Sequence, residues 1–243
     1  ASGAHVTKVP FNADWTFPLD GMIRAMTAEA PRVLIFSSPS NPAGPAISET
    51  EFGALLKATP ADTLVVFDEA YLEYLEPAAR FDAMARLAAG PHPWLILRTF
   101  SKAYGLAGVR VGYGIACAPD LAAQMMKARN PFGVNALAVA AARAALRDTD
   151  HLALSVGLAA EGRAHLARHL SEAGFVCAPS QTNFVFFDTG GVATDFAEAL
   201  RHRGVLIKPW LEDPFTSWAR VTVGTPDENR YFLEAVEAMR VLA

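Results

Sequence analysis

The sequence predicts an α/β fold, with a three-layer large domain around a mostly parallel sheet followed by a small C-terminal α+β domain. Three largely apolar runs, at residues 32–36, 64–67 and 94–97, are typical of parallel strands buried inside a sheet. Helical patterns separate these runs, and polar residues follow each of them. Because ligands of open α/β sheets gather at the carboxyl ends of the strands, the polar residues predict one convergent site.

The large domain is expected to cover residues 1–148. Two further strands are predicted for it, a short alternating one at residues 5–10 and another at residues 111–116. Ser48 and Glu51 have the spacing of a capping box, which predicts a helix that runs to about residue 58. The other helices are predicted at residues 20–29, 81–89, 120–129 and 135–147.

The small domain is expected to cover residues 149–243. A long amphipathic helix at residues 151–173, closed by Gly174, leads into it. The strands predicted after that helix are at residues 182–187, 205–208 and 220–223, with a helix at residues 194–203 between the first two. Thr225 and Glu228 are expected to cap a final helix.

Composition narrows the class of protein. The formal charge of −4, without a basic block, offers no electrostatic footprint for nucleic acid or an anionic membrane. No stretch approaches the roughly 18 apolar residues of a membrane span. Two cysteines far apart predict free thiols in a reducing cytoplasm, and we assign none of the six histidines to a site and predict no metal. A cytoplasmic protein is therefore expected.

The most informative stretch follows the strand at residues 94–97. It carries Ser101 and Lys102, with Arg110 eight positions after the lysine. A lysine among small and aromatic residues at the end of a core strand needs a partner, and a Schiff base with a carbonyl cofactor supplies one. Arginine and serine donors suit a phosphate. An aldehyde and a phosphate together describe pyridoxal phosphate (PLP).

These residues resemble the cofactor-lysine segment of fold-type I aminotransferases, that is, class I and II. Two upstream motifs occur in the order of that family. The first is Ser37-Ser38-Pro39-Ser40-Asn41-Pro42-Ala43-Gly44, and the second is Asp68-Glu69-Ala70-Tyr71. Residues 135–138 and 220–225 are most similar to histidinol-phosphate aminotransferases. The N-terminal part of the family's chain has no counterpart here, so the large domain is expected to be incomplete.

The resemblance implies roles around the cofactor. Lys102 would hold the aldehyde and shuttle a proton as the catalytic residue. Asp68 would face the pyridine nitrogen. The phenolic oxygen would be met by Tyr71 and Asn41, and the phosphate by Ser101, Arg110 and, more weakly, Thr99. Each of three residues has a structural alternative, which is a helix cap for Asp68, a turn for Asn41 and a salt bridge for Arg110.

The resemblance also implies substrate contacts. Arg220 would grip the substrate carboxylate through its planar fork. Lys208 stands where many histidinol-phosphate enzymes have an arginine for the substrate phosphate, and lysine binds phosphate only as a point charge. Asn183 resembles a substrate-side asparagine, with a structural amide as the alternative.

The sequence thus predicts a PLP-dependent transaminase, a homodimer that moves an amino group between L-histidinol phosphate and 2-oxoglutarate in histidine biosynthesis. Its partners would be a small-molecule amino donor and a 2-oxoacid. A threonine-phosphate decarboxylase and an aminotransferase for aromatic or other amino acids remain alternatives. A non-catalytic PLP-binding regulator module is a further one, and it would require a DNA-binding extension.

Overall fold

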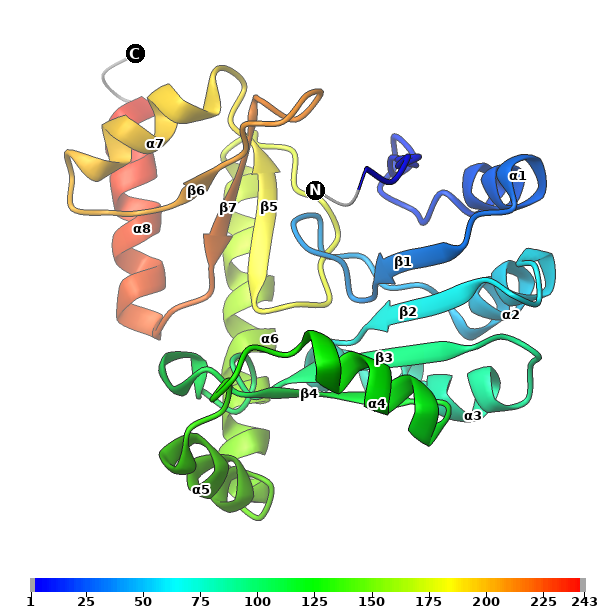
Figure 1. Ribbon diagram of the computed structural model, residues 1–243. Helices are drawn as coiled ribbons and strands as arrows, with labels where there is room; N and C mark the ends of the chain where they lie inside the picture. Colours follow the sequence, from blue (N-terminus) through cyan, green and yellow to red (C-terminus); the bar gives the residue numbers. More distant parts are fainter. Residues whose placement is uncertain (1–2, 241–243) are drawn as a thin grey trace.

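The computed structural model describes residues 3–240, in which two β-sheets lie beside a long central helix (Figure 1). The first sheet has the order β1-β2-β3-β4, with β1, β2 and β3 parallel and β4 antiparallel to β3. Its strands are β1 (Val33–Ser37), β2 (Leu64–Asp68), β3 (Trp94–Thr99) and β4 (Gly112–Ala116). The predicted runs therefore form one mixed, mostly parallel sheet.

Helices cover this sheet. They are α1 (Leu19–Glu29), α2 (Glu49–Ala58), α3 (Ala83–Ala88) and α4 (Pro119–Ala128), with short 3₁₀ turns η1 (Leu72–Tyr74), η2 (Pro77–Ala79) and η3 (Ala107–Val109). Aromatic rings join α2 to the strands, because Phe52 lies 5.0 Å from Phe67 and 6.1 Å from Phe36 between ring centroids. Ser48 caps α2 as predicted, and its amide donates in return to Glu51 at 2.8 Å.

The strand β1 differs from its prediction as a buried strand. Leu34 is buried in the core, but the next residue, Ile35, is 70% exposed. Successive side chains of a strand point to opposite faces, and no described element covers the second face beside β1. An apolar run alone therefore did not reveal that one face of this strand is open.

The second sheet is antiparallel and has the order β5-β7-β6. Its strands are β5 (Phe184–Asp188), β6 (Lys208–Pro209) and β7 (Trp218–Thr222), and the accompanying helices are α5 (Ala136–Ala145), α6 (Thr149–Glu172), α7 (Ala193–Arg201) and α8 (Pro226–Arg240). The core between them includes Leu170, Phe187 and Phe232. The helix α6 runs from the first sheet to the second (Figure 1). The division at residue 148 stays a prediction, and its outer ends, residues 1–2 and 241–243, lie outside the described residues.

Two predicted strands are wrong in whole or in part. Residues 5–10 form no strand; Val9 packs on the core and Thr7 donates to Glu29, while Pro10 has no amide hydrogen to give a ladder. The strand predicted at residues 205–208 is limited to β6, because only Lys208 and Pro209 pair with β7. Within residues 3–240 we find no helix with the length and apolarity needed to cross a membrane.

Candidate active site

Lys102 lies in a tight loop that connects β3 to β4. The loop closes on itself, since the amide of Gly105 donates to the Lys102 carbonyl at 2.9 Å and that of Leu106 to the Phe100 carbonyl at 2.9 Å. The half-buried Lys102 side chain reaches the face of Tyr71, with Nζ 5.3 Å from the ring centroid. The lysine and the tyrosine of two separate motifs are thus brought together.

Tyr71 is held by the turn that follows β2. Asp68 ends the strand, and its Oδ1 accepts from the Ala70 amide at 2.9 Å, which shapes the chain into η1. Tyr71 is buried as a result. The Asp68 carboxylate therefore organises the turn and stands at the carboxyl end of its strand, as the sequence predicts.

Phe184, the first residue of β5, links the two sheets. Its ring packs edge-on against Tyr71 at 5.4 Å between centroids, and the guanidinium of Arg220 lies over it at 4.9 Å. Lys102, Tyr71, Phe184 and Arg220 therefore form one continuous row of contacts. Sequence reasoning missed Phe184, because an apolar residue at the start of a strand looks like any other core residue.

Arg220 carries a buried donor that no described residue satisfies. Its Nη1 donates to Oδ1 of Asn41, but its Nε is buried and has no hydrogen-bond partner among the described residues. Lys208 stands directly opposite Arg220 in the β6–β7 register, so two cations share one face of the sheet. Like charges opposite each other are destabilising, and a buried donor without an acceptor is costly. The arrangement fits an anionic ligand.

The predicted phosphate-binding residues all belong to the β3–β4 connection. Thr99 Oγ1 accepts from the Ser101 amide at 3.0 Å. Arg110 is exposed, its Nη1 donates to the Ala107 carbonyl at 2.9 Å, and its φ of 58° is in the left-handed region. Such a conformation is uncommon for a residue other than glycine and occurs often at functional sites. No described contact joins Arg110 to Lys102.

Asn183 lies just before β5. The hydrogen bond described for it is made by its carbonyl, which accepts from the Val223 amide at 2.8 Å. This contact anchors the backbone at the end of the β5–β7 pair. Because it is a main-chain bond, it bears on neither role of the Asn183 side chain, and both the structural amide and the contact with substrate stay predictions.

A buried ion pair behind the site was not predicted. Glu69 is only 3% exposed and receives a hydrogen bond from Arg98 Nε at 2.8 Å. Burial raises the pKa of Glu69 above its ordinary value, and the Arg98 guanidinium opposes that rise. Glu69 follows Asp68, and Arg98 lies four positions before Lys102. A second carboxylate directly after a buried strand was the only signal of this pair.

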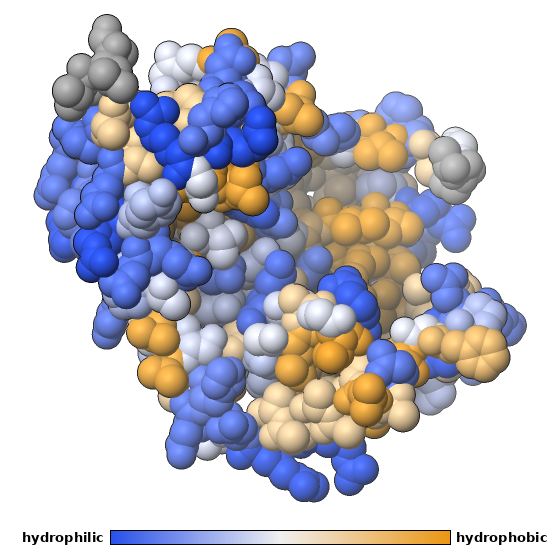
Figure 2. All heavy atoms as spheres, turned by 90° about the vertical axis from the view of Figure 1, so that its left-hand side faces the viewer, coloured by the Kyte–Doolittle hydropathy of each residue, from blue (hydrophilic) through white to orange (hydrophobic). Residues whose placement is uncertain are grey.

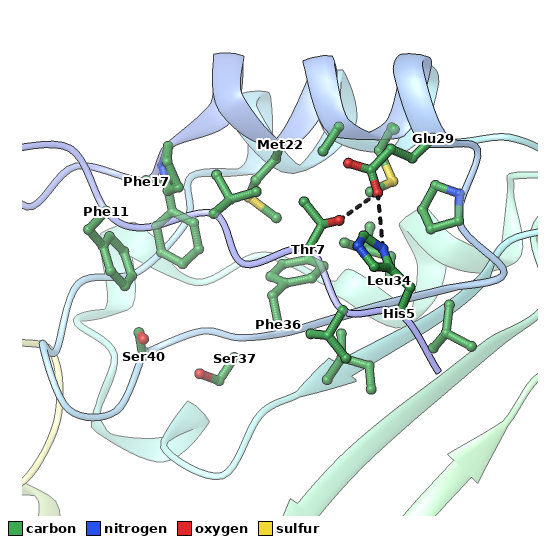
Figure 3. A pocket seen from close by; sticks show the side chains of 18 of the residues that line it. His5, Thr7, Phe11, Phe17, Met22, Glu29, Leu34, Phe36, Ser37 and Ser40 are labelled. Carbon is green, nitrogen blue, oxygen red and sulfur yellow. Dashed lines mark hydrogen bonds and ion pairs between the residues drawn. The ribbon is translucent and has the colours of Figure 1, made fainter. Parts of the chain in front are cut away.

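An apolar pocket of about 540 Å³ lies apart from this row of contacts (Figure 3). The N-terminal segment, α1 and β1 line it, and Phe17, Met22 and Phe36 point into it. Its lining contains Ser37 and Ser40, but none of the predicted site residues. The pocket therefore does not coincide with the candidate active site.

Known proteins are similar to this chain in sequence and in fold. The family model for aminotransferase class I and II matches residues 1–236. Histidinol-phosphate aminotransferase 1 of Mesorhizobium japonicum is 44% identical over 98% of this chain and 64% of that protein. The histidinol-phosphate aminotransferase of Symbiobacterium thermophilum is 43% identical over 97% of this chain and 64% of that protein. The crystal structure of histidinol-phosphate aminotransferase from Sinorhizobium meliloti in complex with pyridoxal-5'-phosphate matches with a TM-score of 0.87 at 34% identity, covering 99% of this chain and 66% of that one.

These matches confirm the predicted α/β fold class and the resemblance on which it was based. The chain belongs to the class I and II aminotransferase family. It spans just under two thirds of the length of the relatives described above, at 64% and 66%.

Proposed function

We propose that this chain is part of a PLP-dependent transaminase that moves an amino group between L-histidinol phosphate and 2-oxoglutarate, in histidine biosynthesis. The observation that carries the proposal is the row of contacts from Lys102 to Arg220, which joins a reactive amine to an unsatisfied guanidinium. The relatives named histidinol-phosphate aminotransferase, up to 44% identical, support this choice of substrate.

The donor groups present fit PLP. When bound, PLP would supply an aldehyde for an amine and a ring that accepts electrons from the carbon being deprotonated. Lys102 Nζ would hold the aldehyde and, once released by the substrate amine, carry the proton to and from the reacting carbon. The remaining contacts would be Asp68 to the ring nitrogen, Tyr71 and Asn41 to the phenolic oxygen, and Ser101, Thr99 and Arg110 to the phosphate.

The substrate would be oriented from the second sheet. The Arg220 fork matches a planar carboxylate, which would also give its buried Nε an acceptor. Lys208, opposite Arg220, would attract the phosphate of the amino donor as a point charge, and Asn183 would contact the substrate from the start of β5. On this proposal residues 1–148 hold the cofactor and residues 149–243 hold the substrate.

The proposal includes a cytoplasmic homodimer. Figure 2 shows apolar side chains gathered low on the face that it presents, over α5. Leu137 of that helix is 78% exposed, and Val139 is exposed as well. Exposed apolar surface of this kind is suited to contact with a second subunit.

The identity of the cofactor-binding lysine is tested by trapping. The full-length protein is loaded with PLP and reduced with borohydride, and its peptides are mapped by mass spectrometry. The label is expected on Lys102, and Lys102→Ala is expected to lower turnover by about 10³-fold or more. Lys127→Ala, on the exposed surface of α4, is the control. A label on another lysine would refute the assignment.

A further inference from the structure

The segment of residues 180–184 touches two of the three loops that carry predicted site residues, namely the loop of Asn41 and the turn of Tyr71. The amide of Gln181 donates to the Gly44 carbonyl at 2.8 Å, three residues after Asn41. The side-chain Oε1 of Gln181 accepts from the Glu76 amide at 3.1 Å, in the turn that follows Tyr71. The segment ends in Phe184, which packs between Tyr71 and Arg220. Its position therefore sets the distance between the two halves of the candidate site.

Close packing on the Gly44 side leaves the segment little freedom. Gly44 has a φ of +101°, and a Cβ at this position would lie 2.7 Å from the Cα of Ser180. That separation is shorter than any van der Waals contact between carbons, and the opposing atom belongs to the backbone. The Asn41 loop and the segment of residues 180–184 can therefore pack this closely only with glycine at position 44.

Arg163 holds the segment from the other side. It is 8% exposed in the middle of α6, and its Nη1 donates to the Thr182 carbonyl at 2.6 Å. Thr182 is fully buried, and its hydroxyl bonds to Ser180 Oγ and accepts from the Phe184 amide. None of the ion pairs described for residues 3–240 includes Arg163, and the charge that acts on it is that of the Glu76 carboxylate, which lies too far away for an ion pair. A buried guanidinium lowers the stability of the fold unless its charge and donors are compensated. The burial of Arg163 against the Thr182 carbonyl therefore suggests a specific role for this bond.

We propose that Arg163 is a positioning residue that fixes residues 180–184 through the Thr182 carbonyl and so keeps Phe184 between Tyr71 and Arg220. The inference rests on the proposed function, in which Arg220 binds a carboxylate. Loss of the Arg163 donor frees the Phe184 platform and moves Arg220 relative to Asn41. Carboxylate binding then weakens, while the PLP contacts of Lys102, Ser101 and Arg110, which lie on the β3–β4 connection away from the segment, are retained.

The first test compares ligand affinities in the full-length, PLP-loaded protein. Glutarate, a dicarboxylate that cannot react, is titrated by calorimetry, and PLP affinity is measured separately by absorbance. Arg163→Met is expected to raise the Kd of glutarate about tenfold and that of PLP by less than about threefold. Arg163→Lys keeps a charged donor, so its Kd for glutarate is expected to rise less than that of Arg163→Met. Arg168→Met, on the exposed side of the same helix, is the control and is expected to match the wild type.

Two results of this first test overturn the inference. One is a glutarate Kd for Arg163→Met that equals that of the control. The other is an Arg163→Lys variant that is as weak as Arg163→Met, because a bond to the carbonyl would then not be the cause.

A second test does not depend on the reaction. Hydrogen exchange of the Gln181 and Glu76 amides in the full-length protein is expected to be about tenfold faster in Arg163→Met, with unchanged exchange in β2. If wild-type protein binds no glutarate, the proposed function fails, and the exchange rates still decide the role of Arg163. Unchanged exchange at both amides overturns it.

If Arg163→Met does not fold, a variant on the opposite side of the segment, at Gly44, replaces it. Gly44→Ala presses on Ser180 and is expected to accelerate exchange at Gln181 in the same way. Arg163→Lys then supplies the readout specific to Arg163, with exchange between that of the wild type and that of Gly44→Ala. Exchange at the wild-type rate in both variants contradicts the inference.

Discussion

Arg220 shows at the scale of one residue why geometry matters as much as charge. Its guanidinium shares one bond with Asn41 and one ring face with Phe184, and its Nε still lacks an acceptor. Lysine could supply the charge but not the fork. Arg220→Lys is therefore expected to raise the Kd of glutarate by about 100-fold, or about 3 kcal/mol. Calorimetry on the PLP-loaded protein measures this Kd, and Arg230→Lys, at an exposed arginine, is the control. A change no larger than that of the control would remove Arg220 from the site.

Glu69 gives a prediction about pH. Burial raises its pKa above the ordinary 4.5, against the pull of Arg98. The folded state then binds this proton more tightly than the unfolded chain does, so the contribution of Glu69 to stability is full below pH 4.5 and is lost as the pH rises through the folded pKa. Glu69→Gln lacks this titration. Its free energy of unfolding relative to wild type is expected to increase from about pH 4 to about pH 8, as measured by denaturant titration.

The control for this prediction is Glu49→Gln, which removes the exposed partner of Arg86. It reports what the loss of an ordinary surface ion pair does over the same pH range. A relative stability of Glu69→Gln that falls as the pH rises would mean that the Arg98 charge outweighs burial.

Motifs in the sequence single out some of the residues that the structure brings together. Lys102 and Tyr71 belong to separate motifs, and the structure brings them into contact. Phe184 and Arg163 carry no motif, because their importance comes from contacts with residues distant in sequence. The bond from Arg163 to Thr182 spans 19 positions, and that from Glu76 to Gln181 spans 105.

For whole helices and strands, the sequence rules that depend on neighbouring residues gave the most accurate predictions. The helix α2 starts at its predicted capping box, in which Ser48 accepts from the Glu51 amide and the Glu51 carboxylate accepts from the Ser48 amide. Ser48→Ala is expected to lower the free energy of unfolding by about 1 kcal/mol, and Ser48→Gly by only a few tenths. Denaturant titration of the two variants measures this difference. Equal losses for alanine and glycine would show that the cap does not stabilise α2 in this way.

Strands were harder to predict because they need a partner. The alternation at residues 5–10 resembles a strand, but these residues pack on the core without joining a ladder. The apolar run of β1 does form a strand, yet it leaves Ile35 exposed, because the cover of each face depends on other segments. Caps are encoded within four residues, whereas pairing and cover depend on distant parts of the chain.

At the scale of the whole molecule, the candidate site depends on both sheets. The first sheet supplies Asp68, the loops that follow its strands supply Lys102 and Tyr71, and the second sheet supplies Arg220 and Lys208. The helix α6 spans both and holds the connecting segment through Arg163. A site divided in this way brings an amine and an arginine with an unsatisfied donor to either side of one aromatic row. Amino-group transfer from a phosphate-bearing amine to a 2-oxoacid would use this arrangement.

The most direct test of that account is a visible-absorbance titration of the full-length protein loaded with PLP. Addition of L-histidinol phosphate is expected to remove the absorbance band of the lysine-bound cofactor, and 2-oxoglutarate is then expected to restore it. Loss and recovery together would demonstrate both halves of the transfer. A band that L-histidinol phosphate leaves unchanged, or that the oxoacid fails to restore, would contradict the proposed reaction.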